Sequence, residues 1–261
     1  MSSYRFLPDP TRRETLGLLM GAGVSLALPG RAAAAGDARA ILKRAFDNWR
    51  ADSSHAVTEM LVKHGSSRKM TLESWTKGDD KALVRVIAPA RDAGNATLQL
   101  GNATYVFNPK LNQVIKLPAS AMSQSWLGSD FSYDDLSRSQ KVVDDFTHKL
   151  IGSETSGGKR VDVIESIPKP GKPIVWGKEI IRVRADGVLI GVEFYDQLGK
   201  RVRAMTADKV GVIGGRPYPV VLTMKTDAKP GQYTRVTTKS AEFNISIPAY
   251  MFTKSNLQNP R

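Results

Sequence analysis

Short runs of alternating apolar and polar residues, separated by turn residues, are the feature that most constrains the fold of this chain of 261 residues. A period of two places successive side chains on opposite faces of a strand, and Gly, Asn, Asp and Pro supply the turns between antiparallel neighbours. About eleven strands without recurring helices predict a mainly β domain and argue against a doubly wound α/β fold. The expected strands cover residues 57–63, 69–77, 82–88, 96–100, 104–107, 161–167, 179–184, 188–195, 202–207, 218–226 and 233–243, and strand-like sequence resumes from residue 142.

One amphipathic helix is expected before the strands, over residues 37–52. Its apolar residues recur at spacings of three and four, which places them on one helical face. Long strand runs at 188–195 and 218–226 contain Gly191 and Pro219, where a kink or an edge is tolerated. We therefore expect one strongly curved antiparallel sheet with the helix on its concave side.

The first 35 residues are typical of an export signal. Arg12 and Arg13 precede an apolar run at 16–28 that is too short for a stable membrane anchor, Pro29 ends the run, and alanines at 33–35 offer a cleavage site. The segment TRRETL (residues 11–16) is similar to a twin-arginine signal, with the general secretory route as the alternative. We expect cleavage near Ala35, a periplasmic product, and a single domain over residues 36–261.

The cysteine content and the net charge limit the kinds of partner that the exported domain is expected to have. The chain has no cysteine, so no disulfide staples the fold and no thiol is available for lipid attachment; we expect a soluble protein, as a monomer. The signal carries four arginines and two acidic residues, so its removal lowers the net charge from +13 to +11. The cations are dispersed, which favours an anionic membrane surface or lipid head group over nucleic acid as partner. Solubility alone explains the charge equally well.

Three sequence blocks within residues 89–136 carry a family resemblance. They are PARDAGNATL (89–98), NPKLNQVIKLP (108–118) and SWLGSDFSYDDL (125–136), in which a GSDFS.DDL block follows a K.P.S stretch. With these blocks the chain resembles the outer-membrane lipoprotein-sorting proteins, the LolA-like periplasmic carriers. The resemblance implies an incomplete, half-open β-barrel of LolA/LolB type, covered by the N-terminal helix and a helical lid insert.

That lid corresponds to residues 119–140, which we call the insert. Its Ser, Ala, Met, Trp and Asp content interrupts the strand pattern after Pro118, and residues 132–136 are typical of a helix start with acids in the first turn. The family pattern implies a basic residue that helps to lock the lid. No arginine aligns with that residue; Arg91, in the first block, is a candidate for a lid contact or a turn.

Catalytic motifs are scarce in the sequence. The three histidines, His55, His64 and His148, lack metal-ligand spacing, and we expect His55 and His64 at opposite ends of one strand, exposed to solvent. Gly128-Ser129-Asp130 lacks the G-x-S-x-G elbow of a serine hydrolase. Adjacent acids point to opposite faces of a strand and cannot form a general acid/base pair. We expect no enzyme activity, no metal and no cofactor; a hydrolase would need a Ser, a His and an acid brought together in a pocket.

The sheet and the insert carry many large apolar side chains. A single curved sheet cannot bury all of them, because it has no second sheet to pack against. They are either core residues or the lining of a cavity whose lid moves to admit an acyl chain. Burying a chain of about fifteen CH₂ groups gains roughly 12 kcal/mol, enough to carry a lipid through water. The candidate cavity and lid residues are Met70, Leu72, Trp75, Tyr105, Phe107, Met122, Trp126, Leu127, Phe131 and Tyr133.

The sequence and the resemblance together favour a periplasmic carrier that shelters acyl chains of a lipoprotein or a free lipid in transit between membranes, as in outer-membrane lipoprotein sorting. Such a carrier implies an inner-membrane transporter or an outer-membrane acceptor as partner. The alternative is a cargo-free periplasmic module that docks on a lipid exporter of the resistance-nodulation type. A concavity filled by the protein's own side chains would favour that alternative.

Overall fold

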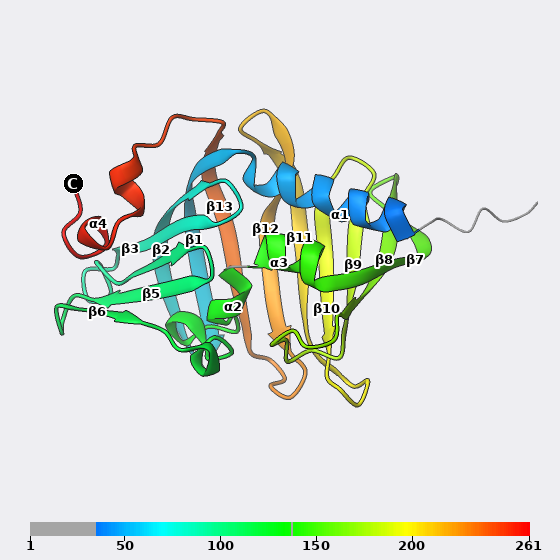
Figure 1. Ribbon diagram of the computed structural model, residues 1–261, viewed down its shortest axis with the longest axis horizontal. Coiled ribbons are helices and arrows are strands. Elements are labelled where there is room, and N and C mark those ends of the chain that lie inside the picture. Colours follow the sequence, from blue (N-terminus) through cyan, green and yellow to red (C-terminus); the bar gives the residue numbers. More distant parts are fainter. Residues whose placement is uncertain (1–34, 137) are drawn as a thin grey trace, which may run out of the picture. The chain divides into compact units, whose positions relative to one another are not determined.

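A single antiparallel sheet of thirteen strands organises the chain in the computed structural model, which describes residues 35–136 and 138–261 (Figure 1). The predicted export signal lies outside the described residues, apart from Ala35. The strands are β1 (Ser53–His64), β2 (Ser66–Lys77), β3 (Lys81–Ala88), β4 (Ala96–Leu100), β5 (Ala103–Asn108), β6 (Gln113–Lys116), β7 (Phe146–Ser156), β8 (Lys159–Pro168), β9 (Lys178–Arg184), β10 (Leu189–Tyr195), β11 (Arg201–Ile213), β12 (Arg216–Thr226) and β13 (Tyr233–Phe243).

Four α-helices and three 3₁₀ turns accompany the sheet within the described residues. None of these helices combines the length and the apolar character needed to cross a membrane. The α-helices are α1 (Ala35–Arg50), α2 (Tyr133–Leu136), α3 (Arg138–Asp145) and α4 (Lys254–Gln258), and the 3₁₀ turns are η1 (Ala119–Ala121), η2 (Trp126–Gly128) and η3 (Ala249–Phe252).

The strand order is β6-β5-β4-β3-β2-β1-β13-β12-β11-β10-β9-β8-β7. Two meanders, β1 to β6 and β7 to β13, are thus joined where β1 pairs with β13, over the register from Ser54 opposite Phe243 to Lys63 opposite Tyr233. The two edge strands, β6 and β7, are consecutive in sequence but lie at opposite ends of the sheet. The segment between them must therefore cross the sheet.

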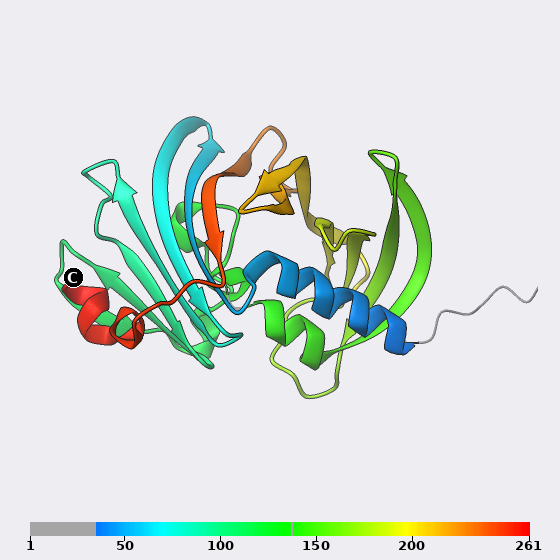
Figure 2. The same ribbon diagram turned by 90° about the horizontal axis from the view of Figure 1, so that it is seen from above.

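The sheet is curved, and α1 and α3 lie on its inner side (Figure 2). Helix α1 buries Ala38, Leu42 and Ala45 at its predicted spacing, against apolar side chains of β8 to β10 and β12 and against Val142 and Val143 of α3. A second inner cluster gathers Met60, Val62, Met70, Leu72, Val86 and Trp126. The predicted mainly β fold, with a curved open sheet and a helix on its concave face, is confirmed.

The outer face of β3 to β5 carries a third apolar cluster, covered by the C-terminal segment. Leu83 and Leu98 point outward because their neighbours in the strands face the inner side. Phe252 of η3 and Leu257 of α4 cover them, and the buried Arg85 side chain donates to the carbonyl oxygens of Asn256 and Leu257, at 2.7 and 3.3 Å. These bonds satisfy acceptors at the end of a short helix and fix it to the sheet.

Two segments differ from the sequence expectation. Strand β6 (Gln113–Lys116) was not among the expected strands, because a run of four mostly exposed residues leaves little pattern to detect. The strand-like sequence from residue 142 belongs to α3, and β7 begins only at Phe146. Val142 and Val143 favour a strand locally, but packing against α1 stabilises the helix there.

Leu257→Ala tests how strongly the C-terminal segment contributes to stability. Leu257 is fully buried, so its truncation should lower the free energy of unfolding by about 2–5 kcal/mol. Leu198, which is 93% exposed, offers a matched control, and Leu198→Ala should leave stability within about 0.5 kcal/mol of wild type. Denaturant unfolding measures both; equal small effects would mean that the segment is not part of the cooperative core.

His148 of β7 is buried beside α3 in its neutral form. Its Nε2 donates to the carbonyl oxygen of Val143 at 3.3 Å, which leaves Nδ1 to accept from the Ser166 hydroxyl at 2.9 Å. Burial lowers the pKa of His148 below 6.5, with Arg39 and Lys169 acting in the same direction.

The free energy of unfolding should therefore fall as the pH is lowered through 6.5. In that range the histidine binds a proton in the unfolded chain, whereas His148 in the folded protein stays neutral. The contribution of His148 to the free energy of unfolding is present in full above pH 6.5. It is lost as the pH falls towards the lower pKa of His148 in the folded protein. His148→Gln, which can still donate to Val143 and accept from Ser166, should flatten the slope of unfolding free energy between pH 7 and pH 5. Parallel slopes for wild type and variant would contradict this assignment.

Candidate functional site

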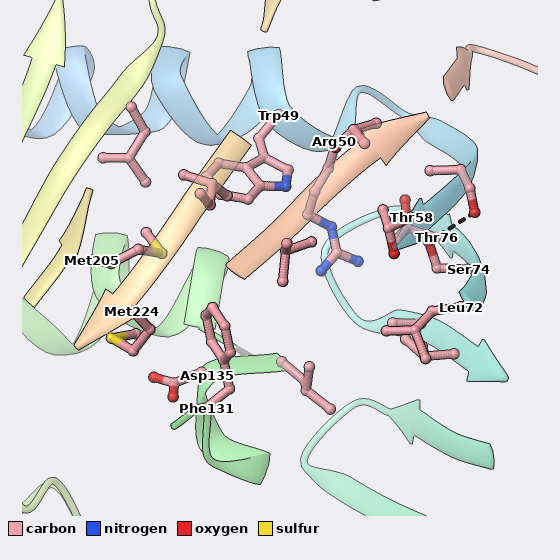
Figure 3. Close-up of a pocket in the computed structure, with 18 of the residues that line it drawn as sticks. Trp49, Arg50, Thr58, Leu72, Ser74, Thr76, Phe131, Asp135, Met205 and Met224 are labelled. Carbon is pink, nitrogen blue, oxygen red and sulfur yellow. Dashed lines mark hydrogen bonds between the residues drawn. The ribbon is translucent and has the colours of Figure 1, made fainter. Parts of the chain in front are cut away.

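A cavity of about 280 Å³ lies on the inner side of the sheet, between the cluster under α1 and the cluster around Trp126 (Figure 3). It is lined by α1, by the strands β1 to β3 and β9 to β13, and by the insert. An apolar cavity of 150 Å³ is enough to bind benzene, so this space is large enough for a longer hydrocarbon segment. The concavity is thus not filled by the protein's own side chains.

Most of the lining is apolar. Helix α1 contributes Phe46 and Trp49, and Phe131 approaches from the insert. The floor comes from side chains of β9 to β13, which point inward at a period of two. These floor residues are Ile181, Leu189, Val192, Phe194, Met205, Tyr218, Leu222, Met224 and Val236.

The lining on β1, β2 and β13 also includes hydroxyl-bearing side chains, beside Leu72 and Val236. Ser54 and Thr76 share a hydrogen bond of 2.7 Å, and Thr58 lies opposite Thr238 across the β1–β13 pair. The side chain of Arg50, at the end of α1, extends towards these hydroxyls (Figure 3). The cavity therefore has an apolar part and a polar part.

The loop of residues 125–132, within the family-like block, closes one side of the cavity and is held by buried hydrogen bonds. The Trp126 amide donates to the Phe131 carbonyl at 2.7 Å, and the indole Nε1 donates to Thr97 Oγ1 at 3.1 Å. Gly128, with φ at +68°, takes the left-handed conformation that the tight turn requires. The Arg68 guanidinium also donates to the Leu127 carbonyl.

Asp130 attaches this loop to the sheet. Its carboxylate, 1% exposed, accepts from Thr234 at 2.7 Å and contacts His64 Nε2 at 2.9 Å. Its backbone amide donates to the same Thr234 hydroxyl at 2.9 Å. Carboxylates are rarely buried unless several polar partners surround them, and here β1, β12 and β13 all contribute one.

Asp135 provides the second attachment, through a buried ion pair with Arg203 of β11. Two hydrogen bonds of 2.7 and 2.9 Å join the guanidinium to the carboxylate, and the two side chains are only 8% and 6% exposed. Arg203 also donates to the Asp130 carbonyl at 3.1 Å and lies over the ring of Phe194. A two-point arginine–carboxylate contact fixes orientation as well as position.

The structure brings several of the predicted site residues together on the inner side. Leu72, Trp126 and Phe131 line the cavity. Met70, Leu127 and Tyr133 belong to the adjoining cluster, where burial raises the pKa of the Tyr133 hydroxyl. Trp126 fills one end of the concavity, and the cavity lies beside it.

Other candidates lie elsewhere. Trp75, Tyr105 and Phe107 pack in the outer cluster under the C-terminal segment, because the strand period places them opposite the cavity-lining residues. Met122 is half-buried in the insert and is not among the lining residues. Arg91 is an exposed turn residue that contacts Asp92 at 3.3 Å, which agrees with the turn alternative.

Sequence reasoning missed Arg50 and Arg203. A helix-terminal arginine is ordinarily a solvated cation, and an arginine within a strand does not show which face it occupies. The available signal was the acid content of the 125–136 block, since a carboxylate buried there would require a cation or several donors.

The histidines show no catalytic arrangement. His55 stacks on Trp75 and contacts Glu73 at 2.8 Å, while His64 contacts the buried Asp130, so both have specific partners instead of solvated surroundings. His148 contacts Ser166, and neither residue lines the cavity. Among the described residues, no group of three His, Asp or Glu could hold a metal ion.

Asp135→Ala should lower the free energy of unfolding by about 3–5 kcal/mol, because it leaves the buried Arg203 cation without its carboxylate. Asp227→Ala is a matched control: it removes a similar carboxylate from Arg201 of the same strand, in a pair that is 46% and 33% exposed. The control should change stability by at most about 1 kcal/mol. If chemical denaturation gave equal losses, the Asp135 pair would not be the buried anchor described above.

The sequence was compared with protein families and with curated proteins. A family model described as an uncharacterized protein matches residues 78–259, which is more than half of the chain. Among curated proteins, none matches the sequence.

Three solved structures share the fold over most of the chain. A DUF1329 family protein from Desulfovibrio piger has a TM-score of 0.78 at 18% identity, covering 85% of this chain and 98% of its own. A candidate outer-membrane lipoprotein-sorting protein domain from Vibrio parahaemolyticus has 0.74 at 23% identity, covering 86% and 100%. A LolA superfamily protein from Nitrosomonas europaea has 0.69 at 21% identity, covering 84% and 98%.

Proposed function

We propose that this chain is a periplasmic carrier of acyl chains. The proposal starts from two findings: the chain belongs to the family whose model matches residues 78–259, and the chain has the LolA-like fold. In this proposal the cavity shelters the hydrocarbon of a lipid or of a lipoprotein while the domain moves between membranes. The mature domain, residues 36–261, would reach the periplasm after cleavage of the export signal near Ala35.

The observation that carries the proposal is the apolar cavity of about 280 Å³ on the inner side of a single sheet. Its lining includes Phe46, Phe194 and Met224. In a domain that binds no ligand, such side chains normally pack against one another at the density of a protein core. Each CH₂ group transferred there from water gains about 0.8 kcal/mol. The fold shared with a LolA superfamily protein supports the same role.

In the proposed mechanism, the insert acts as the lid of the cavity. Phe131 contributes to the cavity wall, while Asp130 and Asp135 on either side of it bind the sheet through polar contacts. Polar anchors leave the apolar wall free to exchange protein contacts for contacts with a hydrocarbon chain. Binding and release of cargo would then change the position of Phe131 more than that of the anchors.

Binding of N-phenyl-1-naphthylamine, a neutral apolar fluorophore, tests the proposal. Wild-type protein should enhance its fluorescence at saturable stoichiometry. Ala56→Phe places a ring in the cavity from the β1 side and should weaken binding by about tenfold or more, with a stability change of about 1–3 kcal/mol at most.

Ala40→Phe, on the exposed face of α1, is the matched control and should bind the fluorophore as wild type does. Absence of binding by folded wild-type protein would overturn the carrier proposal and favour the cargo-free module that docks on a lipid exporter. Equal loss of binding in both phenylalanine variants would show that the fluorophore binds outside the cavity.

A further inference from the structure

We propose that Thr58 and Thr238 form a site for an uncharged carbonyl group at one side of the cavity. The site binds the ester or amide carbonyl of an acyl chain, whose hydrocarbon lies against the apolar part of the lining. The inference rests on the proposed carrier function and adds to it the chemical class of the group that orients the cargo.

A β-bulge positions the two threonines. The register of the β1–β13 pair shifts by one residue just before Thr58. The partner of Thr58 is Thr238, three positions from Ala241, which is the partner of Ala56. Residues directly opposite one another share a face of the sheet, so the extra residue reverses the alternation on β13 and turns Thr238 towards the cavity. Bulges redirect side chains in this way beside many functional sites.

Two hydroxyls placed opposite one another can share one carbonyl oxygen. Side chains directly opposite on neighbouring antiparallel strands have Cβ atoms about 4.5–5.5 Å apart. A hydroxyl donates over about 2.7–2.8 Å, so both threonines reach an acceptor that lies between them. A carbonyl oxygen has two lone pairs and therefore accepts from both hydroxyls.

Neither threonine hydroxyl has a protein partner among the described residues, although both side chains line the cavity. Thr238 is only 7% exposed. The other hydroxyls of the lining are engaged, since Ser54 and Thr76 share a bond of 2.7 Å and Ser74 donates to a backbone carbonyl at 3.4 Å. A buried hydroxyl without a partner costs free energy, and a ligand oxygen at Thr58 and Thr238 recovers that cost.

The charged groups of the lining favour an uncharged ligand. Arg50 and Asp135 have opposite signs, so the lining carries no net charge. Protein groups bind both of them: Arg50 donates to two backbone carbonyl oxygens at 3.0 and 3.1 Å, and Asp135 accepts from Arg203 at 2.7 Å. A lining without net charge gives an ionised ligand no excess of opposite charge, and burial of a charge costs far more than burial of a carbonyl group.

The apolar lining continues from the threonine pair and gives the acyl chain a direction. Val236 is the next inward residue of β13, and Leu222 lies opposite it on β12. Met224 of β12 and its partner Met205 of β11 extend this surface. Figure 3 shows Thr58 on the other side of the cavity from both methionines. The carbonyl group therefore lies at β1 and β13, and the hydrocarbon points towards β11.

Displacement of bound N-phenyl-1-naphthylamine by three uncharged ligands of equal chain length tests the inference. Methyl decanoate and N-methyldecanamide carry the carbonyl oxygen, and methyl decyl ether has a CH₂ group in its place. At least one carbonyl ligand should displace the fluorophore at a concentration about five- to fiftyfold lower than the ether requires, the range that two hydrogen bonds supply. The stronger of the two carbonyl ligands identifies the linkage as ester or amide.

Two variants assign this preference to the threonine pair. Thr58→Val and Thr238→Val each remove one donor and should lower the preference for the carbonyl ligand by about three- to tenfold, while the ether still binds. Their denaturation midpoints should not fall below that of wild type, because each variant loses a hydroxyl that has no partner. Thr237→Val is the matched control: Thr237 precedes Thr238 on β13, faces the outer side and should retain the full preference.

Equal displacement by the carbonyl ligands and the ether in wild-type protein would overturn the carbonyl site and leave the carrier proposal standing. A preference kept in both valine variants, or lost equally in Thr237→Val, would also overturn it, since the carbonyl group would then bind elsewhere. Lower denaturation midpoints with an unchanged preference would overturn it as well, because the hydroxyls would then serve the fold alone. Failure of the fluorophore to bind would overturn the proposed function, and this inference with it.

Discussion

The pairing of β1 with β13 is the constraint on which the rest of the structure depends. It joins two meanders at the middle of the sheet and leaves β6 and β7 at opposite edges, so the chain between them has to cross the sheet. On the inner side this connection closes one side of the cavity. Asp130 and Asp135 then hold it against strands from the second meander, through Thr234 and Arg203.

The two faces of the sheet use apolar surface differently. On the outer face, Leu83 and Leu98 are closed over by the C-terminal segment with Phe252 and Leu257. On the inner face, α1 and the insert cover the two ends of the concavity and leave the cavity between them. The space on the inner face supports the proposed binding role, because an unfilled apolar cavity lowers stability.

Local pattern predicted the elements well and the site only in part. The spacing of apolar residues predicted the face that α1 buries, and alternation predicted most strands. Alternation places Leu72 and Trp75 on opposite faces but does not say which face is concave. Both were therefore candidates for the cavity lining, although only Leu72 lines it. Arg50 and Arg203 were missed because an exposed arginine and a buried arginine have the same sequence signature.

By itself the sequence determined a mainly β domain, its turns, its single long helix and the block at 125–136 that resembles lipoprotein-sorting carriers, because these depend on periodicity and on residues near one another in the chain. Only the tertiary structure decided which side chains meet. Arg203 bonds to Asp135 across 68 positions, and Arg50 of α1 lines the same cavity as the hydroxyls of β1. Such contacts depend on the strand order and curvature of the whole sheet, which no local pattern encodes.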